Sequence, residues 1–385
     1  MTIVEPRTDL VEVARGLRPL IESQAEKVEA EGTLTQTVVD AVADAGLFWI
    51  MVPQEQGGSG ADIGTCIDVF DELAYADGST GWSVMANAST SLFAAIYLPD
   101  EALAAMFGGS RPHIHAGMLG PVGTAVPTDG GYVVEGSYRF GSGTGHADWF
   151  GAGVMEFADG EPALTDTGLP AMKVAFVPRD QVEMIGNWDV MGLAGTGSFD
   201  YRINAVTVPE AHTFKILEAN ALRGGPQFDL GLFGFTASGH AGFALGVGRR
   251  ALDEIVSIAK TKERLGGEST IGRQQLFQHD FAMHDAAVRA ARSYVHDAFG
   301  LAEETVLRGE AVSNVDNQRL RQATTWATRV AADACRFAYT WAGSDGLRNP
   351  SVVQRCFRDI SAATQHIYVD NNTLTGYTQA VLDAS

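Results

Sequence analysis

The stretch GYVVEGSYRFGSGTGHADWFGAGVMEF, residues 131–157, holds two runs of alternating apolar residues on either side of a glycine-rich turn. Alternation with a period of two predicts a β-strand on each side of that turn. Similar runs occur in HIHAGML at 113–119, AMKVAFV at 171–177 and DYRINAVTV at 200–208, with turn residues between them. The pattern predicts an antiparallel barrel or sandwich over residues 113–222 rather than alternating βαβ units.

Helical spacing begins on both sides of this β region. Apolar residues three and four apart recur before it, as in LTQTVVDAVADAGLFWIMVP at 34–53, and after it, as in FTASGHAGFALGVGRRALDEIVSIAKTKERL at 235–265. We therefore expect an α+β fold that is mostly α. Residues 1–112 would form a helical domain, 113–222 the β domain and 223–385 an antiparallel helical bundle.

Composition limits the partners of the chain. Its 385 residues include 27 Lys and Arg against 47 Asp and Glu, a net charge of −20, which disfavours binding to nucleic acid. The longest apolar runs fall short of the roughly 20 residues of a membrane helix, and the first ten residues lack the basic and apolar regions of a signal peptide. Three widely spaced cysteines, Cys66, Cys335 and Cys356, indicate reduced thiols. We expect a cytoplasmic protein without membrane contact.

Several common functional motifs are missing. The glycine-rich segments at 141–145, 192–197 and 242–248 do not follow a strand and open a helix within a βαβ unit, so a Rossmann site is not indicated. For 242–248 the pattern favours close helix packing by small residues. The nine histidines form no HExxH motif, and no GxSxG elbow occurs. The sequence therefore predicts neither a metal site nor a serine nucleophile.

The segment RCFRDISAATQHIYVD at 355–370 carries the most chemistry. On a continuous helix, Ala362, Ala363 and Asp370 would share a face with His366. The two alanines would leave room for a ligand, and Asp370 would orient the imidazole and raise its pKa. The residues alone leave two interpretations open, a histidine that faces a ligand and a histidine that only packs between helices.

Taken in order, the motifs resemble the acyl-CoA dehydrogenase superfamily over essentially the whole chain. The family's N-terminal helical domain is similar to VVDAVADAGLFWIMVPQEQGGSGAD and ELAYADGSTGW. Its flavin-facing strands and loops are similar to SYRFGSGTGHADWF and NWDVMGLAGTGSFDY. Its C-terminal four-helix bundle is similar to AGSDGLRNPSVVQRCFRDISAATQH. The dehydrogenases remove a proton with a glutamate, placed after the RD pair of the bundle or on an earlier helix. Here ISAATQHIYVDNNT follows Arg358-Asp359 and FDLGLFGFTASG covers the earlier position, and neither contains glutamate.

The resemblance therefore favours the two-component flavin-dependent monooxygenases of this superfamily. It implies that reduced FMN or FAD, supplied by a separate NAD(P)H-dependent reductase, reacts with O₂ to a flavin hydroperoxide. That species would hydroxylate, or oxygenate at nitrogen or sulfur, a small aromatic or polycyclic substrate. It also implies a homotetramer.

The same resemblance implies roles for individual residues. Ser142 would bond near flavin N5, and His366 would stand beside the peroxide or the substrate hydroxyl, as the two catalytic residues. Flavin contacts are expected from Tyr138, Phe140, Ser142, Gly143, Thr196, Gly197, Ser198, Arg358 and Asp359, and from Arg264 toward the flavin of a neighbouring subunit. Substrate contacts are expected from Asn87, Trp188, Phe233 and Tyr377.

Two alternatives stay open at this point. One is an acyl-CoA dehydrogenase-type oxidoreductase whose base has moved to Asp359 or Asp370. The other is a protein of this fold that binds flavin or a partner without turnover.

Overall fold

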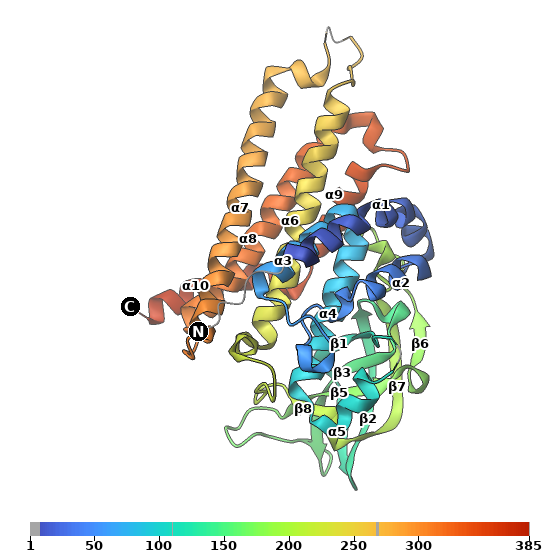
Figure 1. The fold of residues 1–385 in the computed structure, drawn as a ribbon, viewed down its shortest axis with the longest axis vertical. Coiled ribbons are helices and arrows are strands. Elements are labelled where there is room, and N and C mark those ends of the chain that lie inside the picture. Colours follow the sequence, from blue (N-terminus) through green and yellow to red (C-terminus); the bar gives the residue numbers. More distant parts are fainter. Residues whose placement is uncertain (1–7, 110, 267–268, 385) are drawn as a thin grey trace.

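The computed structural model describes residues 8–109, 111–266 and 269–384, and its elements run in the order helices, strands, helices (Figure 1). The first group is α1 (Thr8–Glu31), α2 (Gln36–Asp44), α3 (Ile63–Ala76), α4 (Gly78–Tyr97) and α5 (Asp100–Phe107). The strands are β1 (His115–Thr128), β2 (Gly131–Gly141), β3 (Trp149–Ala158), β4 (Glu161–Pro162), β5 (Met172–Pro178), β6 (Glu183–Gly186), β7 (Phe199–Pro209) and β8 (Thr213–Lys215). The last group is α6 (Gly231–Ala259), α7 (Gln275–Leu307), α8 (Asn314–Ala342), α9 (Val352–Ala363) and α10 (Asn371–Asp383).

The described strands form one sheet in the order β6-β7-β2-β1-β3-β5-β8, with β4 paired to β3. All neighbours are antiparallel except β1 and β3, which run in parallel from His115 opposite Trp149. The expectation of a purely antiparallel barrel or sandwich is wrong in this respect: the sheet is mixed, and its path does not return from β8 to β6.

The parallel pair follows from the short crossing between β2 and β3. β1 and β2 form a hairpin, so β2 ends beside the start of β1. The chain then passes through the 3₁₀ turn η3 (Thr144–His146) and enters the free edge of β1 in the same direction as β1. Apolar alternation is the same for parallel and antiparallel strands, so the sequence did not distinguish them.

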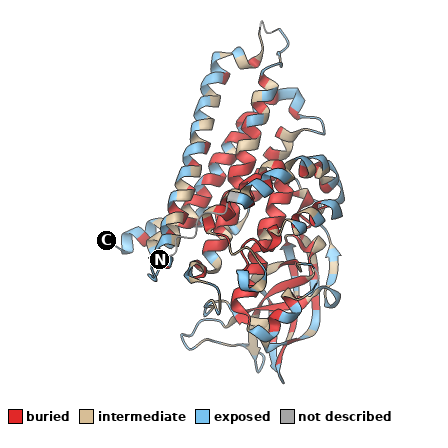
Figure 2. Ribbon diagram, in the orientation of Figure 1, coloured by how far each residue is buried: buried red, intermediate tan, exposed pale blue. Residues whose placement is uncertain are grey.

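Helix α4 packs between the sheet and the bundle, α3 packs against α4 and α6, and this region holds much of the buried core (Figure 2). A Cβ on Gly242 of α6 would lie 2.5 Å from the carbonyl oxygen of Ile67 in α3, and one on Gly246 would lie 2.2 Å from that of Asp71. Close helix packing is thus confirmed as the reason for the glycines at 242–248.

One long apolar helix and the three cysteines of the helical parts are buried in the core. The segment Pro226–Ala259 is long and apolar enough to cross a membrane, but 78% of its most apolar window is buried inside the protein, as expected of a core helix. Cys66, Cys335 and Cys356 are buried free thiols, and burial raises the pKa of Cys356 to about 12.

Candidate functional site

Ser142 lies at the turn after β2 and belongs to a chain of hydrogen bonds. Trp82 of α4 donates from Nε1 to Ser142 Oγ over 2.9 Å, and Ser142 Oγ lies 2.9 Å from Ser198 Oγ. Ser198 Oγ lies 2.7 Å from Thr196 Oγ1, which donates to the carbonyl oxygen of Leu193 over 2.8 Å. Each hydroxyl has one proton, so Ser198 donates to Thr196 and Ser142 donates to Ser198. Ser142 therefore keeps one acceptor lone pair for a ligand.

The loop that carries Leu193 and the 3₁₀ turn η5 (Ala194–Thr196) is anchored by the RD pair of α9. Asp359 Oδ1 accepts the backbone N–H of Leu193 over 2.6 Å, and Arg358 donates to the carbonyl of Met191 over 3.1 Å. A Cβ on Gly192 would lie 2.0 Å from the carbonyl oxygen of Arg358, so only glycine fits there. Burial, together with the nearby Asp77 carboxylate, raises the pKa of Asp359 to about 7. Both residues therefore hold the loop in place.

Gly143 and Gly197 stabilise the other side of the same turn. Gly143 has φ +75° and donates its N–H to Thr196 over 2.9 Å, and a Cβ there would lie 2.4 Å from the side-chain nitrogen of Asn87. Gly197 has φ +56°, beside Thr33. Asn87 is fully buried: its amide donates to the carbonyl of His115 over 2.9 Å, and its oxygen lies 3.0 Å from His146 Nε2. This placement supports a structural Asn87 and does not support a substrate contact.

The side chain of Tyr138 on β2 is buried inside the sheet, while that of Phe140 on the same strand is exposed. Tyr138 is 1% exposed and stacks on Tyr201 inside the sheet, with ring centroids 4.9 Å apart, so the structure does not support its expected flavin contact. The β2–β7 register shifts between Tyr138 and Gly141, and Phe140 adopts φ +61°. Its ring is 62% exposed and lies edge-on to Trp188 at 6.2 Å, next to the Ser142 turn.

His366 lies outside a helix, contrary to expectation. α9 ends at Ala363, and His366 precedes the 3₁₀ turn η10 (Ile367–Val369). Asp370 caps α10 by accepting the N–H of Asn372 over 2.9 Å, so it does not orient the imidazole as predicted. His366 Nδ1 instead accepts the backbone N–H of Tyr368 over 3.3 Å, which places the proton of the neutral ring on Nε2.

Four rings form an aromatic cluster that joins His366 to the Ser142 turn: Trp82, His240, His366 and Tyr368. The His366 ring lies 4.3 Å from His240, 5.6 Å from Trp82 and 5.8 Å from Tyr368, between centroids. Because Trp82 also donates to Ser142, both expected catalytic residues contact the same indole.

The imidazoles of the aromatic cluster are neutral at physiological pH. Burial lowers the pKa of His366 to about 4, the reverse of the predicted increase. Burial and the neighbouring His366 lower the pKa of His240 well below its ordinary value. Burial raises the pKa of Tyr368 to about 12. The cluster can therefore donate and accept hydrogen bonds without carrying charge.

Sequence reasoning missed His240, Trp82 and Tyr368 as members of the site. His240 is the one ionisable residue in FTASGHAGFALGVG, a run that otherwise packs into the core, and that contrast was the available signal. Trp82 stood in the quoted motif ELAYADGSTGW but received no role.

The remaining predicted residues are spread over the bundle and loop. Trp188 donates to the carbonyl of Leu193 over 3.0 Å, and Phe233 is 59% exposed with its ring 6.1 Å from Tyr368. Tyr377 lies on α10 and makes no described ring contact with the aromatic cluster. Arg264 lies beyond the far end of α6, with its guanidinium 4.7 Å from the ring centroid of Trp341.

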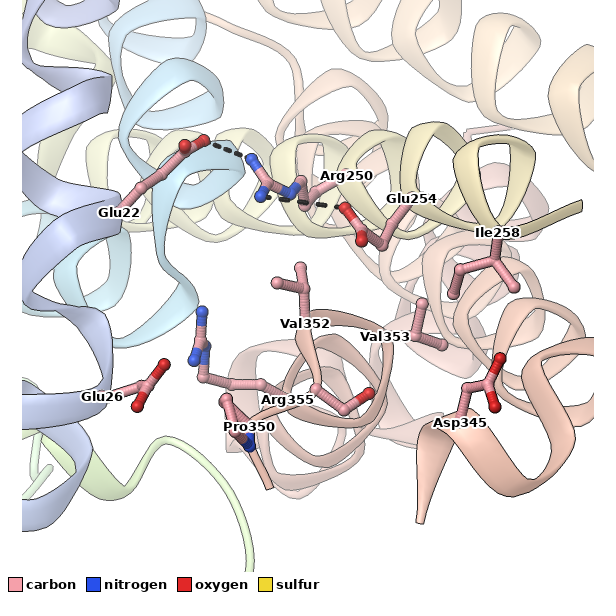
Figure 3. Close-up of a pocket in the computed structure, with 11 residues that line it drawn as sticks. Glu22, Glu26, Arg250, Glu254, Ile258, Asp345, Pro350, Val352, Val353 and Arg355 are labelled. Atoms are coloured by element: carbon pink, nitrogen blue, oxygen red, sulfur yellow. Dashed lines mark hydrogen bonds and ion pairs between the residues drawn. The ribbon is translucent and has the colours of Figure 1, made fainter. Parts of the chain in front are cut away.

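Two surface hollows lie beside the start of α9 rather than at the aromatic cluster. They measure about 300 and 370 Å³ and share Arg355, Glu26 and the segment before α9. In the first hollow Arg250 pairs with Glu22 and, over 3.9 Å, with Glu254 (Figure 3). Neither hollow is lined by Ser142 or His366.

The arrangement fits a flat ring with polar edges, as in a flavin. Ser142 offers an acceptor at the edge, while Phe140, Met191 and Phe233 leave large apolar side chains exposed nearby. Burying apolar area of this kind against a planar ligand is favourable. In the ranges that the structure describes, no group of three or more His, Cys, Asp or Glu side chains is placed to hold a metal ion.

Known proteins with similar sequence and structure show the family and the fold of this chain. Residues 11–99 match the family model "Acyl-CoA dehydrogenase, N-terminal domain", and residues 238–371 match "Acyl-CoA dehydrogenase, C-terminal domain". The chain is 32% identical to indole-3-acetate monooxygenase of Pseudomonas putida, over 88% of this chain and 85% of that protein. It is 27% identical to the oxygenase component of the FADH₂-dependent resorcinol hydroxylase of a Rhizobium species, over 94% and 91%.

Among solved structures, XiaF from a Streptomyces species, in complex with FADH₂ and glycerol, superposes with a TM-score of 0.89. The superposition covers 98% of this chain and 96% of XiaF at 23% identity. At that identity the similarity shows the fold.

Proposed function

Because this chain belongs to the acyl-CoA dehydrogenase family and, within it, to the flavin-dependent monooxygenases, we propose that it is an oxygenase component that hydroxylates an aromatic substrate between Ser142 and His366. When bound, the reduced flavin would supply the electrons that activate O₂. The relatives named for oxygenating aromatic compounds support an aromatic substrate. We propose FAD as the flavin because two of the similar proteins are named with FADH₂, while the dibenzothiophene monooxygenase TdsC of a Paenibacillus species is named with FMN.

The proposal is carried by the two kinds of group that contact Trp82. Its indole N–H bonds to Ser142, a hydroxyl with a free acceptor, and its rings contact the neutral imidazoles of His366 and His240. A dehydrogenase needs a carboxylate base, but Asp359 is bonded to the loop and Asp370 caps α10. The geometry thus favours oxygenation over the alternative with a displaced base.

Each side has a separate task in this proposal. Ser142 would orient the flavin edge by accepting a hydrogen bond, while Trp82 and Ser198 fix its hydroxyl. His366 would hold a proton at Nε2 and donate a hydrogen bond there to the group being oxygenated. The buried rings around it would exclude water.

The deciding experiment supplies FADH₂ or FMNH₂ from a separate NADH-dependent reductase, with ¹⁸O₂ and an indole or phenol. We expect one ¹⁸O atom in the product, and higher turnover with FADH₂. The result that would overturn the proposal is reduced flavin consumed only as H₂O₂ across a panel of aromatics, or oxidation of an acyl-CoA without oxygen incorporation.

We also propose that the protein is a cytoplasmic homotetramer. Exposed Leu265, Leu276, Met283 and Trp326 supply apolar surface on the bundle for subunit contacts, and Arg264 lies at its far end with its guanidinium over the ring of Trp341. Light scattering at micromolar concentration should report four subunits, and a monomeric mass would contradict this assembly.

A further inference from the structure

One arginine near the aromatic cluster has no anionic partner among the residues that the structure describes. Arg321 on α8 is half-buried, and its Nε is buried without a hydrogen-bond partner. Every other half-buried arginine in the described ranges pairs with Asp or Glu. A guanidinium removed from water normally has such a partner, because its charge is costly to bury alone.

The location of Arg321 suggests what the missing partner is. Its guanidinium carbon lies 5.8 Å from the ring centroid of Tyr368, which itself contacts His366 and Phe233. Phe233 and Ile367 are 59% and 70% exposed, so this is the open side of the aromatic cluster. A ligand that enters there meets aromatic faces and one uncompensated cation.

We propose that Arg321 binds the carboxylate of an aromatic acid, so that the substrates of this enzyme are aromatic carboxylates. The planar guanidinium presents paired donors that match a carboxylate, and Phe233 and Tyr368 supply faces for the aromatic ring. The net charge of −20 repels anions at a distance, and a lone arginine supplies the local attraction. The inference rests on the proposed function for the reaction, but its binding step is independent of turnover.

The test compares ligands that differ only in the carboxylate. Calorimetry would measure binding of indole-3-acetate against 3-methylindole, and of 4-hydroxyphenylacetate against 4-methylphenol, to the purified full chain. We expect the wild type to bind at least one acid more tightly than its uncharged counterpart. Arg321→Gln should weaken binding of that acid by about 10- to 100-fold, the range for a hydrogen bond to a charged group, and change the affinity for the uncharged ligand by less than about twofold.

Two further variants serve as controls. Arg321→Lys keeps the charge but not the paired donors, so we expect an intermediate loss. Arg336→Gln removes an exposed cation from the same helix, where it pairs with Asp333, and should leave the acid preference unchanged. The melting temperature of each variant separates loss of the fold from loss of binding.

The proposal is wrong if the wild type binds no acid better than its counterpart, or if Arg321→Gln leaves the preference intact. It is also wrong if Arg321→Gln changes only the mass in solution, because the arginine then pairs with a second copy of the chain. Tighter binding of an acid that depends on Arg321, without any oxygenated product, would support this inference and refute the proposed reaction. Oxygenation of only the uncharged ligands would support the proposed reaction and refute this inference.

Discussion

The two sides of the site are built by different means. On the β side, Ser142 is bonded to α4 and to Ser198, and a glycine wedged against Asn87 follows it. On the bundle side, His366 lies between two helices, and its imidazole accepts one hydrogen bond, from the backbone N–H of Tyr368 over 3.3 Å. Its position is set mainly by contact with other rings. Directional polar bonds thus hold the side that we propose faces the flavin, while packing holds the side that we propose handles protons.

The largest effect that would test this contrast comes from His366→Asn. We expect product formation to fall by roughly 10²-fold, the usual range for a group that handles protons, while the fold and flavin binding persist. Steady-state turnover and flavin titration would measure both. A variant that melts earlier but turns over normally would show that His366 only packs between the helices.

Gly143→Ala should damage the β side through its geometry. The added Cβ would lie 2.4 Å from the Asn87 amide at φ +75°, so we expect a loss of about 2–4 kcal/mol in the free energy of unfolding. Gly130→Ala is the matched control, because Gly130 has the same φ and open space around its Cβ. Equal losses in the two variants would mean that backbone strain alone, and not the wedge against Asn87, accounts for the effect.

Ser142→Ala should uncouple the reaction more than it weakens flavin binding. It removes one acceptor and leaves the buried Trp82 N–H without a partner, which costs about 1–3 kcal/mol. The ratio of product to H₂O₂, measured against NADH consumed, should fall several-fold. Ser137→Ala, an exposed serine of the same strand, serves as the reference, and an unchanged ratio in Ser142→Ala would remove the assigned role.

Acid should weaken the bundle side selectively. The folded-state pKa of His366 is about 4, below its ordinary value of about 6.5, so the unfolded chain takes up its proton first as pH falls. The stability due to neutral His366 is complete above pH 6.5 and declines below it. Between pH 7.5 and 5, we expect wild type to lose about 1–2 kcal/mol relative to His366→Asn. A difference that does not vary with pH would contradict the burial of a neutral imidazole.

The smallest effect is expected for Tyr138→Phe. The Tyr138 hydroxyl is buried with no hydrogen-bond partner in the described structure, so its removal should change stability by less than about 1 kcal/mol. Flavin affinity should not change, because the ring packs on Tyr201 inside the sheet. A marked loss of affinity on titration would restore the original expectation of a flavin contact.

The order of helices and strands could be predicted from the sequence, because apolar periodicity indicates which faces of an element are buried. The apolar residues of this chain follow helical and strand spacing regularly. The sequence did not predict the end of α9 at Ala363, since Thr364 and Gln365 carry no glycine or proline to mark it. The sequence also did not predict that the Tyr138 side chain points into the sheet, because the register shift in β2 arises from its pairing with β7.

Site residues were predictable where a motif carried them and not where they came together in space. Ser142 and His366 stood in quoted motifs, and the structure brings both to Trp82. His240 belongs to a helix whose other residues pack into the core, and a lone histidine on such a helix is usually structural. Only the fold reveals that it lies 4.3 Å from a second imidazole.

The chain of hydroxyls behind Ser142 is a dead end for protons. Every bond from Trp82 to Thr196 points the same way, and the last acceptor is a peptide carbonyl, which takes up no proton at physiological pH. A proton relay needs an exit, so none can run inward from Ser142 along these groups. The hydrogen bonds of the β side therefore form a fixed dipole that conducts no protons, and in the proposed reaction protons exchanged with solvent would pass on the side of His366.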